Sequence, residues 1–127
     1  MRRERIKTSA APTPLANYAQ AVVAGETVYA AGQIASDFKT GVAPQARVDP
    51  AFPFYGSAIE RQTRYTLDNL RATLKAAGCD LADVVKAQVF MTDLGDFHAF
   101  DQVWKEYFPA PPPRSTIGIG ALLVPGC

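Results

Sequence analysis

The segment from Ser57 to Ala77 constrains the fold most, because it combines a helix start, an amphipathic helix and a helix end. Ser57 and Glu60 have the spacing of a capping box, in which the two side chains satisfy otherwise unpaired amides of the first turn. Gly78 stands where a glycine commonly ends a helix. One apolar face recurs at helical spacing and comprises Ile59, Thr63, Leu67, Leu70, Leu74 and Ala77. Such a face must be buried, and we expect it to cover a β-sheet.

The rest of the chain supplies short strands and a second helix. A hairpin is predicted over 19–34, with its turn at Gly25 and Glu26. Four further segments follow: a loop from Phe38 to Tyr55, a turn from Leu81 to Val85, a strand from Lys86 to Thr92 and a strand from Ser115 to Leu123. The second helix is predicted from Phe97 to Phe108, capped by Asp96. This order predicts an α+β domain in which two helices cover one face of a mixed sheet.

Three details of the pattern give further expectations. The strand at 86–92 is apolar on both faces, which predicts a central, covered position. The aromatic residues Phe52, Phe54 and Tyr55 indicate that the loop packs against the domain. Gly118 and Gly120 leave one face of the last strand almost bare, which favours the close approach of another backbone or another subunit.

Composition limits the class of protein. The 127 residues fit one domain, and 13 Lys and Arg against 12 Asp and Glu give a net charge of +1, so no overall basic field favours nucleic acid. A small basic tip at the N-terminus (Arg2, Arg3, Arg5 and Lys7) is interpreted as a solvated end. There is no signal-peptide pattern and no apolar run long enough to span a bilayer. Cys79 and Cys127 lack metal-site spacing, so we expect free thiols in a cytoplasmic protein that uses no metal.

Three prolines lead directly to Arg114 and two hydroxyl residues. Proline stiffens the backbone, so the arginine is expected at the end of a rigid segment, where it could bind a carboxylate through two parallel hydrogen bonds. Taken alone, the composition favours an ordinary surface arginine over this role. His98 and Cys79 have no partner cluster, so a catalytic role is not predicted for either.

Five segments resemble the RidA/YjgF family of reactive-intermediate deaminases. Residues 17–22 are similar to its "PYSQAV" motif, 28–34 to "VYVSGQI", and 62–70 to "QTRQALENL". Residues 86–97 resemble "KTTVFLADMNDF", and Tyr107-Phe108 with 112–115 resemble "EYFP…PPARS". The matches occur in order over nearly the whole chain, and 38–60 is the least similar part and resembles an insertion.

The resemblance implies a chorismate-mutase-like single domain over 1–127 and a homotrimer with clefts between neighbouring subunits. It implies hydrolysis of 2-imino acids, formed from enamines such as 2-aminoacrylate, to 2-oxo acids and ammonia without a cofactor. Arg114 would hold the substrate carboxylate, and Tyr18 would close the cleft. Amides near Ala31 and Gly32 and a carbonyl near Thr116 would place the substrate and a water.

The chain departs from the family pattern at two points. Ala31 replaces a serine, and a final strand with a water-orienting glutamate is expected after residue 127. Without that acid, a non-catalytic trimer that binds small carboxylates, or acts as a chaperone-like or regulatory protein, is the alternative function. An endoribonuclease, an older label of the family, is the least favoured, since the chain lacks a basic and aromatic strip. Neither nucleic acid nor a membrane is expected as a partner.

Overall fold

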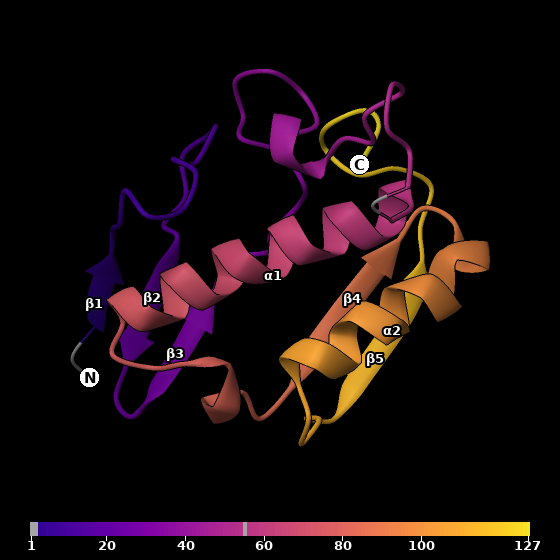
Figure 1. The fold of residues 1–127 in the computed structure, drawn as a ribbon. Coiled ribbons are helices and arrows are strands. Elements are labelled where there is room, and N and C mark those ends of the chain that lie inside the picture. Colours follow the sequence, from indigo (N-terminus) through magenta and orange to yellow (C-terminus); the bar gives the residue numbers. More distant parts are fainter. Residues whose placement is uncertain (1–2, 55) are drawn as a thin grey trace.

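The computed structural model describes residues 3–54 and 56–127, which form strands and two long helices (Figure 1). The strands are β1 (Arg3–Ile6), β2 (Ala21–Ala24), β3 (Thr27–Ala30), β4 (Ala87–Met91) and β5 (Arg114–Gly118). The helices are α1 (Ala58–Ala76) and α2 (Phe97–Tyr107), with 3-10 turns η1 (Pro44–Ala46), η2 (Leu81–Asp83) and η3 (Leu94–Asp96). The α+β class predicted from the sequence is confirmed. No helix of the described residues is long and apolar enough to cross a membrane.

The first three strands form an antiparallel sheet in the order β1-β2-β3. The predicted hairpin is confirmed: Ala24 faces Thr27 across a two-residue turn in which Gly25 has a φ of 62°. Residues 3–6 form strand β1, which was not predicted from the sequence and pairs with β2. Arg3 and Arg5 stay exposed on this edge strand while Ile6 is buried. Arg2 lies outside the described residues.

The second sheet pairs β4 with β5 in parallel, and α2 forms the crossover between them. Ala87, Val89 and Met91 face the helices, but Gln88 and Phe90 are exposed, so the prediction of a strand covered on both faces is wrong. Strand β5 ends at Gly118, five residues before the predicted end.

Helix α1 begins as predicted. The Ser57 hydroxyl accepts a hydrogen bond from the Glu60 amide, and the Glu60 carboxylate accepts one from the Ser57 amide. At its other end, Gly78 has a φ of +83°, which the predicted glycine cap requires. The start of α2 differs, because Asp96 makes no side-chain cap, whereas Asp93 caps the preceding turn by accepting the Gly95 amide at 2.8 Å.

The main core lies where both helices meet the strands. Its buried members are Leu67, Leu74, Leu81, Met91, Phe100, Trp104 and Phe108. Val28 of β3 and Val89 of β4 pack on this same cluster, so both helices cover one side of the two sheets. The helices are also joined by the Arg64–Glu106 ion pair and by a 2.8 Å hydrogen bond from the Tyr107 hydroxyl to Asp68.

The loop after β3 packs through small residues. Ala35, Ala43 and Ala46 form a second buried cluster, with Val42 and Tyr65 against it. The predicted anchors Phe52 and Phe54 are exposed and contact each other edge to face, with ring centroids 5.4 Å apart. Tyr55 lies outside the described residues.

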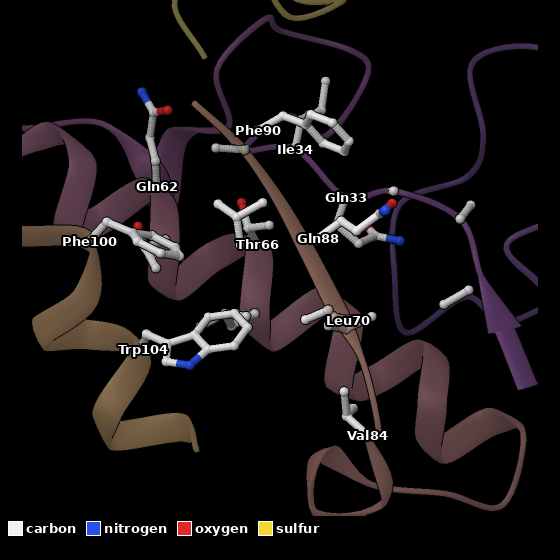
Figure 2. A pocket seen from close by; sticks show the side chains of 18 of the residues that line it. Gln33, Ile34, Gln62, Thr66, Leu70, Val84, Gln88, Phe90, Phe100 and Trp104 are labelled. Carbon is white, nitrogen blue, oxygen red and sulfur yellow. The ribbon is translucent and has the colours of Figure 1, made fainter. Parts of the chain in front are cut away.

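A groove of about 1130 Å³ separates the two sheets (Figure 2). Strand β3 forms one wall and β4 the other, and Thr66, Leu67 and Leu70 of α1 line it. Among the described residues, β3 pairs only with β2 and β4 only with β5, so both walls are open strand edges. The further strand expected from the family resemblance stays a prediction.

Candidate active site

The predicted site residues form two groups within one chain. Tyr18, Ala31 and Gly32 line the groove at the β3 side. Arg114 and Thr116 lie on β5, which β4 separates from the groove. The structure therefore brings three of the five residues together and places the other two at the opposite edge of the β4–β5 sheet.

The backbone near Ala31 is only partly available to a ligand. The Ala31 amide donates to the Gln20 carbonyl at 2.9 Å, so this amide, which we expected to be free, is used by the fold. Among the described residues, no group accepts the Gly32 amide, and a methyl group at Gly32 would have nothing within 4 Å. Gly32 therefore presents an open donor in the groove that the exposed Tyr18 also lines.

Gln20 organises this end of the site, a role that the sequence analysis missed and that only its place in the motif could have indicated. Its side chain is buried, accepts the Thr8 amide at 2.8 Å, and donates to the carbonyls of Thr8 and Pro12 at 3.1 Å. These bonds fix the segment before β2, from which Tyr18 projects. A buried amide with all three bonds satisfied is a structural support.

Arg114 occupies a more enclosed position than a surface arginine. Its side chain is 16% exposed, and Nη1 donates to Asp101 Oδ1 at 2.9 Å. The guanidinium carbon lies 5.4 Å from the ring centroids of Phe97 and Phe100 and 4.9 Å from that of Trp104. We call these three rings the aromatic platform. The pattern of α2 predicted its aromatic face but not that the face would hold a cation.

Thr116 offers a backbone group near this arginine. Ala87 donates to the Pro113 carbonyl and Ile119 donates to the Met91 carbonyl. In a parallel sheet, the backbone groups of every second residue bond to the neighbouring strand. Because Pro113 and Ile119 bond to β4, Thr116 belongs to the other set, and its amide and carbonyl point to the open edge of β5. Among residues 3–54 and 56–127, none donates to this carbonyl, so a fixed cation and a free carbonyl lie two residues apart on one strand.

The displaced pKa values belong to residues other than the five predicted site residues, although Cys127 lines the same groove as Tyr18. Burial and then the hydrogen bond to Asp68 raise the pKa of Tyr107 to about 12. The bond to Arg64 lowers the pKa of Glu106, and burial raises that of the Cys127 thiol. His98 is exposed, both cysteines are free as expected, and the described residues contain no cluster of potential metal ligands.

This arrangement can bind and orient a small anion. A guanidinium on an aromatic platform favours a carboxylate, and an open amide or carbonyl can orient a polar group beside it. Because the two groups lie at different edges, they do not line one cleft within the chain.

Known proteins match nearly the whole chain. The family model described as Endoribonuclease L-PSP matches residues 8–127. A 2-iminobutanoate/2-iminopropanoate deaminase of Dermatophagoides farinae is 35% identical, over 92% of this chain and 84% of that protein. The crystal structure of a putative endoribonuclease from Thermotoga maritima superposes with a TM-score of 0.79 at 36% identity, covering 94% of this chain and 87% of that one. E. coli TdcF with bound serine gives a TM-score of 0.75 at 31% identity, covering 94% and 88%. By sequence and by fold, the chain belongs to the RidA/YjgF family.

Proposed function

We propose that this protein hydrolyses 2-imino acids to 2-oxo acids and ammonia, in clefts between the subunits of a homotrimer. The observation that carries the proposal is the guanidinium of Arg114, which the aromatic platform and Asp101 hold in place on the same strand as the open carbonyl of Thr116. Two comparisons support it, since one relative is named as an imine deaminase and one related structure holds serine, a small carboxylate.

Positioning supplies most of the catalysis in this proposal. Arg114 binds the substrate carboxylate and so fixes the neighbouring C=N carbon. The Thr116 carbonyl accepts a hydrogen bond from a water and aims its oxygen at that carbon. Tyr18 and the Gly32 amide, supplied by the adjacent subunit, close the cleft from the other side.

The reaction balances without a redox partner. Water adds its oxygen to the carbon of the protonated imine, and the C=N π electrons move to nitrogen. One proton of the water passes to the nitrogen, so the C–N bond breaks with both electrons and ammonia leaves. The second water proton passes from the hydroxyl to the departing ammonia as the C=O bond forms, giving a 2-oxo acid and ammonium.

In the direct test, an amino-acid oxidase generates 2-iminopropanoate continuously in the presence of semicarbazide, which traps the imine. The measured quantity is the amount of imine that is hydrolysed to pyruvate before semicarbazide traps it. Wild-type protein should accelerate release, and Arg114→Met should remove the acceleration because the carboxylate loses its cation. Arg5→Met, on the exposed edge strand β1, is the matched control and should behave as wild type. Saturable binding of pyruvate without acceleration would support the non-catalytic carboxylate-binding alternative instead.

The shared cleft has its own test. Arg114→Met and Tyr18→Phe are each expected to be inactive, yet refolding them together should restore activity. In randomly mixed trimers about a quarter of clefts combine an intact Tyr18 with an intact Arg114 from the neighbour, so about a quarter of wild-type activity is expected. No recovery on mixing would place both residues in one subunit's site or outside it.

A further inference from the structure

Asp101 contacts the proposed substrate anchor from helix α2. Its Oδ1 accepts the hydrogen bond from Arg114 Nη1 at 2.9 Å, and its Oδ2 lies 3.8 Å from Lys105 Nζ. The Asp101 side chain is 24% exposed whereas that of Lys105 is 64% exposed. The carboxylate thus joins an enclosed cation to an exposed one.

The contact leaves a defined part of the guanidinium open. The ring centroids of the aromatic platform lie about 5 Å from the guanidinium carbon of Arg114, and Asp101 accepts a hydrogen bond from Nη1. No described residue accepts a hydrogen bond from Nε or Nη2. An Nε–Nη2 edge matches the two oxygens of a carboxylate, so this is the edge at which a substrate would bind bidentately.

We propose that Asp101 is the positioning residue for Arg114: it holds Nη1 so that the Nε–Nη2 edge is presented to the substrate carboxylate. This inference rests on the proposed function. Without Asp101, the rings alone would hold the guanidinium, and an attraction to ring faces does not fix its rotation within its own plane. Asp101 supplies the missing directional contact, because a charge-assisted hydrogen bond is both strong and directional.

The charges around Asp101 remain compatible with an anionic ligand. Arg114 and Asp101 alone would form a neutral pair and attract a carboxylate weakly. Lys105 lies one helical turn from Asp101, so the cluster of Arg114, Asp101 and Lys105 carries one net positive charge. Since the Arg114–Asp101 contact is largely enclosed, solvent screens it less than it screens the Lys105 contact.

The opposite role makes a different prediction. If Asp101 competed with the substrate for Arg114, removing its charge would strengthen carboxylate binding. If Asp101 positions Arg114, a neutral acceptor of the same shape should preserve binding, and loss of the acceptor should weaken it. Asp101→Asn and Asp101→Ala therefore separate the two roles.

The experiment measures the Kd of 2-oxobutanoate by calorimetry, and KM and kcat with the corresponding imine. Asp101→Ala should raise both Kd and KM about tenfold, the size expected for one charge-assisted hydrogen bond, and change kcat less. Asp101→Asn should stay within about threefold of wild type, because its amide oxygen still accepts from Nη1. Glu26→Ala, at the exposed hairpin turn, is the control.

A second variant keeps the test decisive if Asp101→Ala does not fold. Asp101→Glu keeps the charge but moves the acceptor by one methylene, so it should also raise Kd and KM. Unchanged binding in Asp101→Ala or Asp101→Glu, or binding more than about threefold tighter in Asp101→Asn, overturns the positioning role. Arg114→Met separates this from the proposed function: if that variant binds 2-oxobutanoate as wild type does, Arg114 is not the anchor and the proposed site itself is wrong.

Discussion

Replacing Trp104 by alanine should destabilise the protein more than most single changes. Its side chain is 5% exposed, and its ring centroid lies 5.7 Å from that of Phe100 and 4.2 Å from that of Phe108. Truncating a buried tryptophan to alanine costs about 3–5 kcal/mol, a range that includes the lost ring contacts and the cavity left behind. With a urea m-value of about 2 kcal/mol/M, the unfolding midpoint should fall by about 2 M.

The assay is urea unfolding followed by far-ultraviolet circular dichroism, because Trp104 is the single tryptophan and its fluorescence is lost with it. Trp104→Phe keeps one ring in the core and should cost less than half as much. Leu123→Ala is the control, since that side chain is 69% exposed and its loss should leave the midpoint unchanged. A shift below about 0.5 M for Trp104→Ala would contradict the packing described for this core.

Three further predictions concern a cap, a glycine and a phenol. Ser57→Ala removes the capping box of α1 and should cost about 1 kcal/mol in urea unfolding. Gly78→Ala should cost about 1–2 kcal/mol because its φ is +83°. In an ultraviolet pH titration of the folded protein, one phenol should ionise near pH 12 and be missing in Tyr107→Phe. The pKa of Tyr107 is raised from 10 in the folded protein, so its stabilising contribution is complete below pH 10 and is lost as the pH rises through about 12. Between pH 10 and pH 12, the free energy of unfolding should therefore fall less in Tyr107→Phe than in the wild type.

The elements that the sequence predicted well are those whose signals are local. The capping box at Ser57 and the turn at Gly25 each involve residues a few positions apart, so the pattern contains the whole interaction. Strand β1 was missed because only Ile6 is buried on this edge strand, which leaves no alternation of apolar and polar residues to detect. The prediction that Asp96 caps α2 was wrong because Asp93 caps the 3-10 turn η3 directly before the helix. Asp96 therefore belongs to that turn and does not bond to the amides of α2.

The candidate site shows the same limit over longer distances. Tyr18, Arg114 and their neighbours were found through motifs, but their partners were not. Asp101 reaches Arg114 only because α2 crosses over between two parallel strands and returns its aromatic face to the start of β5. The aromatic pattern of α2 predicted a buried face correctly, yet the same rings bury Trp104 in the core and carry Arg114 at its edge.

This double use of one helix face links the stability of the fold to the proposed chemistry. The aromatic platform and Asp101 lie on successive turns of α2, so any shift of that helix moves the core and the guanidinium together. Tyr18 and Gly32, by contrast, are held by the segment that Gln20 fixes beside β2. One half of the proposed cleft therefore depends on α2 and the other on the N-terminal sheet. In the homotrimer that we propose, the geometry between Arg114 of one subunit and Tyr18 of its neighbour would be set by how the subunits pack, so the catalytic distance would be a property of the assembly.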